Sequence, residues 1–274
     1  MRRAALLALA LLGAGCSSAS PFERLRDAAP FVVVAHRGDS AAVPENTVAA
    51  FEASVRAGAQ MVEFDVFQSK DGAWVCMHDH TLDRTTDAVA RLGRAGVRVD
   101  ELTLAELREL DAGSWFDAAY AGARIATLEE ALAAIAPAMP MIEHKQGDPD
   151  ALVSELRRLD RIDDVLVQSF DWDWLEQVHR LEPRLLIGAL CGGEPTAARL
   201  AELDRTGARV VHWGHDRMTA AAARQVLNGG RLLCVYTVDD EDEFRRCLEI
   251  GCQMITTNRP GHFVALGEAL LAQR

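Results

Sequence analysis

Short apolar runs alternate with stretches of helical periodicity along most of this 274-residue chain. Helices are expected from about Glu45 to Ala57, near residues 103–110 and 127–136, and between the later apolar runs. Each apolar run has the length of one β-strand. The eight runs expected to form strands are Phe31–Ala35, Met61–Phe67, Met141–Lys145, Val165–Gln168, Leu185–Ala189, Arg209–His212, Leu232–Tyr236 and Met254–Thr256.

Repeated alternation of strand and helix predicts an α/β protein with a parallel sheet, and eight such units predict a closed, TIM-type (β/α)8 barrel. A doubly wound open sheet is the alternative. No G-x-G-x-x-G motif follows the first apolar run, so dinucleotide binding has no support.

The barrel is expected to be distorted near its second strand. A further apolar run, Ala73–Met77, follows the second strand across the turn Lys70-Asp71-Gly72, which predicts a hairpin. Residues 79–126 then separate this hairpin from the next helix and strand, which is longer than an ordinary loop. We therefore expect a small insertion at the mouth of the barrel, at about residues 79–126.

The N-terminus is typical of an exported protein. Arg2 and Arg3 precede the apolar run Ala4–Leu12, which is too short to span a bilayer, and small residues lead to Cys16. This pattern resembles a bacterial lipoprotein signal, with plain signal cleavage as the alternative. We expect a signal peptide over residues 1–15, a tether over 16–30 and a barrel over 31–274. The resemblance implies a periplasmic, membrane-anchored protein with a lipid on Cys16.

Composition limits the partners. Hydrophobic residues make up 49% of the chain and charged residues 26%, which is enough for a large core. The net charge is −12, and removal of residues 1–15 leaves −14, which argues against nucleic-acid binding. The sequence does not decide the oligomeric state, nor whether Cys247 and Cys252 form a disulfide.

Acidic residues in two of the predicted strands form a candidate metal site. Side chains alternate along a strand, so Glu63 and Asp65 share one face, and Glu143 and Lys145 share a face of another strand. Buried carboxylates are costly unless a cation compensates them. Three carboxylates offer only oxygen ligands, which suit one divalent ion, Mg²⁺ or Ca²⁺. Ordinary surface acids on an edge strand are the alternative.

Two histidines end strand-like runs, at the end of a barrel where active sites lie. His36 follows the first run and His78 follows the hairpin run. A histidine can accept and donate protons near neutral pH. Arg37 offers a planar fork for phosphate oxygens, with a salt bridge to a carboxylate at the barrel mouth as the alternative. Lys145 is one of only two lysines in the chain, and we expect it to hold a phosphate or to brace the carboxylates.

Together these motifs resemble the glycerophosphodiester phosphodiesterase family. The resemblance covers about residues 32–270, and its first half is the more specific. The motifs that carry it are His36-Arg37-Gly38, Pro44-Glu45-Asn46-Thr47, Gly58 to Val66, His78-Asp79, Leu82 to Thr86, Ile142 to Lys145, Gln168 to Asp171, Tyr236 to Val238 and Ile255 to Pro260. Gln60 and Asn258 stand where the family usually has aspartate.

The resemblance implies an enzyme that cleaves a phosphodiester into an alcohol and sn-glycerol 3-phosphate. His36 and His78 would be the acid–base pair, and Glu63, Asp65 and Glu143 the metal ligands. Arg37 and Lys145 would bind the phosphate. Glu45 would lie near the metal or the glycerol, or act as a favourable acid at a helix start.

Several points stay open at this stage. Either histidine could act first, and the nucleophile is either water or the neighbouring hydroxyl of glycerol, with the resemblance favouring the hydroxyl. A lysophospholipase D or phospholipase D-like activity on the same barrel is the second hypothesis. For it, the candidate residues of an apolar pocket are Trp115, Phe116, Trp213 and Tyr236, with simple core packing as the alternative for each. A phosphodiester-binding lipoprotein without catalysis is the third.

Overall fold

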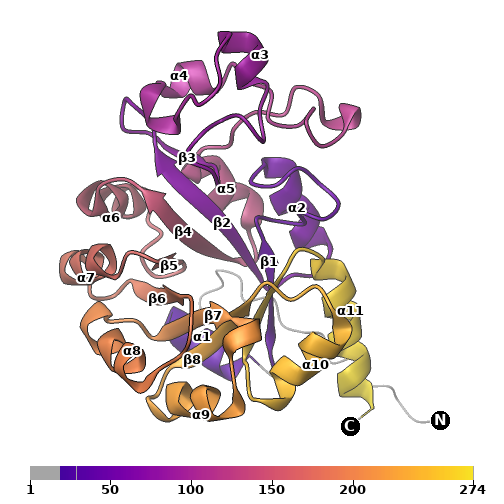
Figure 1. The fold of residues 1–274 in the computed structure, drawn as a ribbon, viewed down its shortest axis with the longest axis vertical. Helices are drawn as coiled ribbons and strands as arrows, with labels where there is room; N and C mark the ends of the chain where they lie inside the picture. The colour runs from indigo at the N-terminus through magenta and orange to yellow at the C-terminus, as the bar shows by residue number, and fades with distance from the viewer. Residues whose placement is uncertain (1–18, 29, 274) are drawn as a thin grey trace.

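The computed structural model describes residues 19–28 and 30–273. Eight parallel strands close into a barrel, and a ninth, β3, is antiparallel to β2 (Figure 1). Closure follows from the pairing of β1 with both β2 and β9. The strands are β1 Val32–His36, β2 Met61–Gln68, β3 Trp74–Cys76, β4 Met139–Gln146, β5 Leu166–Ser169, β6 Leu186–Cys191, β7 Val210–Gly214, β8 Leu232–Tyr236 and β9 Met254–Thr257. The predicted barrel is confirmed, and the open-sheet alternative is wrong.

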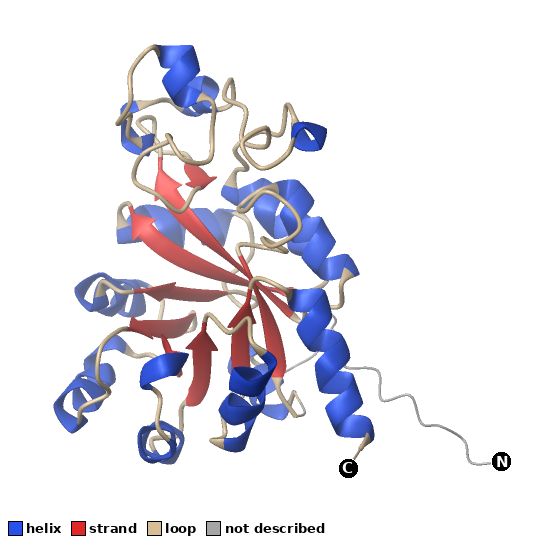
Figure 2. Ribbon diagram, turned by 45° about the vertical axis from the view of Figure 1, so that its right-hand side comes forward, coloured by secondary structure: helices blue, strands red, loops and turns tan. Residues whose placement is uncertain are grey.

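Helices surround the barrel on its outer side, as the view coloured by secondary structure shows (Figure 2). Most begin at a Thr or Asp side chain that accepts a backbone N–H of the first turn, as Thr47 does from Ala50 N. The helices are α1 Pro21–Asp27, α2 Val48–Arg56, α3 Ala88–Leu92, α4 Leu104–Leu107, α5 Leu128–Ile135, α6 Pro149–Arg158, α7 Trp172–Leu181, α8 Ala197–Ala201, α9 Ala220–Asn228, α10 Glu241–Glu249 and α11 Pro260–Ala272.

The two faces of each barrel strand have different roles. On β2, Val62, Phe64 and Val66 belong to the core between the strands and the helices, whereas Glu63 and Asp65 face the interior, as predicted. The lower interior is apolar. It is filled by residues near the strand starts: Val32, Val34, Met61, Met139, Met141, Leu166, Leu186, Val210, Leu232, Cys234 and Met254. Among the described residues, the polar side chains of the barrel interior gather near the C-terminal ends of the strands, where the candidate site lies.

The expected tether is partly helical. Residues 21–27 form α1, in which Ser20 and Glu23 make reciprocal capping hydrogen bonds and Pro21 occupies the first turn. Leu25 is 2% exposed and packs against the apolar interior at the strand starts. The prediction of a plain tether over 16–30 is wrong here, because α1 closes the lower end of the barrel.

The predicted insertion has its own small core. It follows β3 and contains α3, η1 Val99–Glu101, α4 and η2 Ala118–Tyr120, and it lies beyond the ends of β2 and β3 at the top of Figure 1. Its apolar side chains pack on Phe67 and Val75 of that hairpin: Met77, Leu82, Ala88, Val97, Val99, Leu107, Leu110, Ala112 and Ile125. The insertion is thus anchored to the strand pair that ends beside the site.

The expected signal peptide and Cys16 lie outside the described residues. Within residues 19–28 and 30–273, the structure contains no helix with the length and apolar character that a membrane crossing requires. Cys247 and Cys252 are buried and carry free thiols in this structure.

Candidate active site

A cavity of about 300 Å³ opens at the C-terminal ends of the barrel strands. Its wall has two halves. Charged and ionisable groups come from β1 to β4, whereas the wall from β5 to β8 has amide, aromatic, aliphatic, hydroxyl and buried imidazole side chains. The lining residues are His36, Arg37, Glu63, His78, Glu143, Lys145, Gln168, Phe170, Leu190, His212, Tyr236 and Thr237. Seven of the eight site residues predicted from the sequence lie in or beside this cavity, and Glu45 is placed differently.

The three predicted metal ligands converge at the charged half. Glu63 and Asp65 come from β2, Glu143 comes from β4, and one oxygen of each lies within 4.8 Å of the others. The convergence follows from the register, which places Asp65 directly opposite Glu143. All three side chains are buried, at 1%, 1% and 7% exposed.

Electrostatics at this cluster favour a cation. Burial, followed by repulsion from Asp65, raises the pKa of Glu143 to about 7. Burial and the charges of Asp65 and Glu143 raise the pKa of Glu63 well above its ordinary value. Within the described residues, Glu63 Oε1 has no hydrogen-bond partner. An all-oxygen donor set with surplus negative charge and a free lone pair fits a divalent cation of the Mg²⁺ or Ca²⁺ kind.

Arg37 and Lys145 brace the same carboxylates. Arg37 donates its backbone N–H to Glu63 Oε2 at 2.9 Å, and its Nε lies 3.3 Å from Asp65 Oδ2. Lys145 Nζ contacts Glu143 Oε1 and lies 3.1 Å from Asp65 Oδ1. Burial raises the pKa of Asp65, but the charges of Lys145 and Arg37 outweigh burial and lower it overall. Both cations also line the cavity, where an anionic ligand can reach them.

A tight turn after β1 places Arg37. Arg37 and Asn46 both have a φ of +57°, and Gly38 has a φ of +84°. A Cβ on Gly38 would lie 2.7 Å from the backbone carbon of Ala50, so glycine is required there. Asn46 Nδ2 donates to Asp65 Oδ2 at 2.8 Å, and Asn46 Oδ1 accepts from Asp65 N at 3.2 Å. The turn therefore ties the arginine to the metal-ligand strand.

His36 is oriented by an amide. Its Nδ1 lies 2.6 Å from Asn258 Oδ1. The Asn258 Nδ2 group is used by Asp239, to which it donates at 2.6 Å, so Oδ1 faces the histidine. His36 Nδ1 must then carry the proton, and Nε2 is left as an acceptor. Burial, and next the Arg37 charge, lower the pKa of His36 and favour the neutral ring.

His78 is oriented by a carboxylate instead. Its Nδ1 lies 2.6 Å from Asp79 Oδ1. A carboxylate oxygen can only accept, so Nδ1 donates this hydrogen bond and Nε2 takes no part in it. Arg84 of the insertion donates to Asp79 from Nε at 2.6 Å and from Nη2 at 3.1 Å. The same guanidinium donates to Glu45 at 2.8 Å from both Nη1 and Nη2.

Glu45 neither lines the main cavity nor belongs to the cluster of three carboxylates. It accepts from Arg37 Nη1 at 3.0 Å and from Arg84, beside a smaller cavity under the insertion. Glu45 also lies three residues before the start of α2, outside the helix. Its contacts connect two cations, Arg37 and Arg84.

The four aromatic candidates lie in different parts of the structure. Tyr236 lines the cavity, whereas Trp213 is fully buried in the core between strands and helices, in agreement with the core-packing alternative. Trp115 and Phe116 stack edge to face within the insertion. Phe170 is half exposed at the cavity mouth and meets the Tyr236 ring edge to face.

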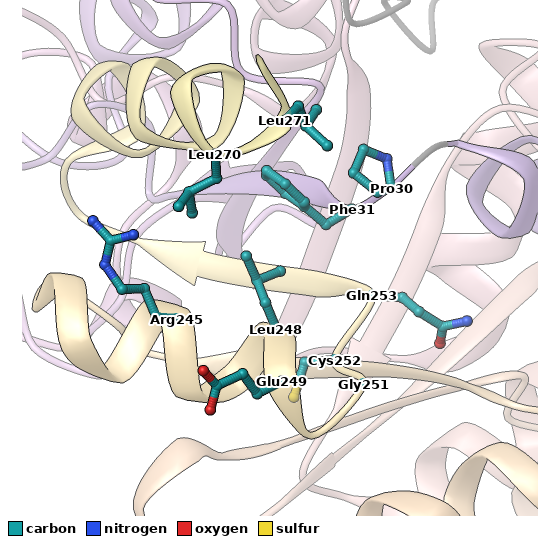
Figure 3. Close-up of a pocket in the computed structure, with 10 residues that line it drawn as sticks. All are labelled: Pro30, Phe31, Arg245, Leu248, Glu249, Gly251, Cys252, Gln253, Leu270 and Leu271. Atoms are coloured by element: carbon teal, nitrogen blue, oxygen red, sulfur yellow. The ribbon is translucent and has the colours of Figure 1, made fainter. Parts of the chain in front are cut away.

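A second cavity, of about 310 Å³, lies at the other end of the molecule, between α10, α11 and the start of β1. In Figure 3 the side chains of Phe31, Leu248 and Leu270 face one another across it. Arg245 and Glu249 lie at its edge. It is mainly aliphatic and contains no cluster of groups suited to acid–base chemistry.

A family model describing the glycerophosphoryl diester phosphodiesterase family matches residues 36–262. The chain belongs to this family. The match begins at His36 and includes every residue of the site described above.

Curated relatives agree with the family. The chain is 32% identical to a glycerophosphodiester phosphodiesterase of Bacillus subtilis, over 96% of this chain and 98% of the relative. It is 34% identical to a glycerophosphodiester phosphodiesterase of Caldanaerobacter subterraneus, over 86% of this chain and 97% of that protein.

Solved structures of the family have the same fold. An Oleispira antarctica phosphodiesterase, solved with the product sn-glycerol-3-phosphate, has a TM-score of 0.77 and 26% identity, covering 85% of this chain and 95% of that one. A glycerophosphodiester phosphodiesterase from Agrobacterium tumefaciens has a TM-score of 0.70 and 28% identity, covering 86% and 99%.

Sequence reasoning did not assign roles to several residues that hold this family member's site. They are Asn46, Asp79, Arg84, Gln168, His212, Asp239 and Asn258. Most lie in motifs that carry the resemblance, and that was the available signal. Their contacts join residues as far as 222 positions apart, which the local pattern does not reveal.

Proposed function

We propose that this enzyme hydrolyses glycerophosphodiesters to an alcohol and sn-glycerol 3-phosphate, using one divalent cation and two histidines. One observation supports this most: three buried carboxylates, two basic side chains and two oriented imidazoles lie in or beside one cavity. The names of the relatives and the sn-glycerol-3-phosphate in the Oleispira structure support the substrate.

Glu63, Asp65 and Glu143 would hold the cation. When bound, a divalent ion polarises a phosphoryl oxygen and offsets the charge that develops there. Arg37 and Lys145 hold the remaining phosphoryl oxygens, because both reach the cavity from the carboxylate side. The negative charge of the three carboxylates would then be compensated by the cation and by Arg37 and Lys145.

The two histidines donate hydrogen bonds to different groups, which supports different roles for them in proton transfer. His36 faces an amide and is favoured as the neutral ring, so its Nε2 accepts a proton from the nucleophile, which is water or the neighbouring hydroxyl of glycerol. Attack by the glycerol hydroxyl gives a cyclic phosphate, which a water molecule then opens to sn-glycerol 3-phosphate. His78 faces the Asp79 carboxylate, which stabilises the positive charge of an acid. His78 Nε2 gives its proton to the alkoxide as the bond from phosphorus to the leaving alcohol breaks.

Turnover with and without metal tests this function. We expect purified enzyme to release sn-glycerol 3-phosphate from glycerophosphocholine, to stop in excess EDTA, and to recover with Mg²⁺ or Ca²⁺. Lysophosphatidylcholine and bis(p-nitrophenyl) phosphate serve as comparison substrates. Full activity in EDTA would contradict the metal site, and a preference for lysophosphatidylcholine would contradict the substrate.

Glu143→Gln tests the metal site without a chelator, and Gln146→Glu is its control. It keeps the size and removes one ligand charge, so we expect it to need more metal for half-maximal activity. Gln146→Glu, on the same strand but outside the cavity lining, should leave the metal requirement unchanged.

A further inference from the structure

The neutral half of the active-site cavity contains a buried amide donor without a partner. Gln168, on β5, is fully buried and lines the cavity. Its Oε1 is 2.8 Å from His212 Nδ1, but within the described part of the chain its Nε2 has no hydrogen-bond partner. Buried polar groups are normally paired, so a free donor in a binding cavity indicates a missing acceptor.

The amide is held in this orientation by two deeper residues. His212 is on β7, and its Nε2 lies 3.0 Å from the hydroxyl of Thr256 on β9. Gln168 Oε1 can only accept, so His212 Nδ1 carries the ring proton and donates to it, and Nε2 then accepts from the Thr256 hydroxyl. The oxygen of the amide is thereby used, and its N–H₂ group is the end left for a ligand.

Glycine on the intervening strand makes this arrangement possible. Gly188 of β6 is directly opposite Gln168 in the register. A Cβ at Gly188 would lie 3.2 Å from Gln168 Cβ and 2.9 Å from Leu166 Cδ2. With no side chain there, Gln168 and His212 can meet across β6, inside the barrel.

The position of the amide indicates which part of the substrate it meets. Gln168 is directly opposite Glu143 in the register, so it borders the carboxylate cluster. Its other cavity neighbours are side chains such as Phe170, Leu190 and Tyr236, with no cation among them. The charged phosphoryl group belongs with Arg37 and Lys145, whereas this side suits a neutral group rich in oxygen.

We propose that Gln168 donates its amide N–H to a glycerol oxygen of the substrate and so recognises the glycerol half, with His212 and Thr256 as positioning residues. This inference rests on the proposed function. It adds a determinant of specificity that distinguishes glycerophosphodiesters from phosphodiesters without glycerol.

Product binding tests this directly. sn-Glycerol 3-phosphate and inorganic phosphate share the phosphoryl group, and only the first has glycerol. We would titrate each into the metal-loaded enzyme by calorimetry. In Gln168→Met we expect the Kd for sn-glycerol 3-phosphate to rise about tenfold, the size of one lost hydrogen bond, while the Kd for phosphate stays unchanged.

Gln60→Met is the matched control. Gln60 is also a buried glutamine whose Nε2 has no partner in the described residues, but it precedes β2 and is bonded to Val33 N, far from the cavity lining. It should lower thermal stability and leave both Kd values unchanged. Thr256→Val, which removes only the hydroxyl that orients His212, should give a smaller loss selective for sn-glycerol 3-phosphate.

The outcomes are separable. Equal weakening of both ligands in Gln168→Met would place the amide on the phosphoryl group and overturn the proposal, as would two unchanged Kd values. If Gln168→Met fails to fold, the Thr256→Val comparison decides in the same way. Failure of the wild-type enzyme to cleave any glycerophosphodiester would instead contradict the proposed function, whatever the variants do.

Discussion

Arg84 has an unusual position among the residues around the site. It comes from the insertion, yet its guanidinium donates four hydrogen bonds to the two carboxylates that hold His78 and Arg37. Glu45 and Asp79 would repel each other without it. Arg84 therefore fixes His78, the proposed acid, relative to Arg37, the proposed phosphate-binding residue, without lining the main cavity.

We expect Arg84→Lys to lower kcat by about 10- to 100-fold with a smaller change in KM. A single ammonium group cannot replace the planar guanidinium that binds both Glu45 and Asp79. A misplaced His78 would then be a poorer proton donor. Steady-state kinetics on glycerophosphocholine would measure this. Arg91→Lys, which alters an exposed ion pair of the same insertion, is the control. An unchanged kcat in Arg84→Lys would show that His78 needs no such support.

The sequence predicted residues that the structure brings together at the cavity, but not the side chains that hold them. His36, Glu63 and Glu143 were found because strands have a period of two and because barrel strands end at one rim. The partners Asn258 and Arg84 lie 222 and 39 positions from the residues they contact. No periodicity encodes such contacts, which depend on barrel closure and on the path of the insertion.

At the scale of elements, α1 is the clearest difference from expectation. Its signals were present in the sequence, since Ser20 and Glu23 have capping-box spacing and Pro21 suits a first turn. A seven-residue helix is too short to be stable from propensity alone. Leu25 provides the missing tertiary contact by packing against the apolar lower interior.

Leu25→Ala should lower the free energy of unfolding by about 2–4 kcal/mol, because it opens a cavity at a fully buried site. Urea denaturation followed by circular dichroism would measure the loss. Leu92→Ala, at a position that is 42% exposed, should cost much less. We expect kcat/KM to stay near the wild-type value in Leu25→Ala, since α1 lies at the opposite end from the cavity. Equal stability of the two variants would contradict a closing role for α1.

At the scale of the whole molecule, the barrel has an apolar lower interior and a polar upper one. The lower layer is a buried apolar cluster, and the upper layer divides into a charged half and a neutral half. The closed barrel was predictable from eight repeated units, but the division of its interior was not. It depends on which strands are neighbours and on Gly188, whose missing side chain lets β5 and β7 side chains meet.

The proposed function depends on one cation held by Glu63, Asp65 and Glu143. Crystals of the enzyme soaked in Mn²⁺, a substitute for Mg²⁺ with a measurable anomalous signal, would locate it. We expect one anomalous peak within coordination distance of all three carboxylates, on the cavity side of Lys145, and no such peak in Glu63→Gln crystals. A peak elsewhere, or an equally strong peak at the same place in the variant, would contradict this assignment.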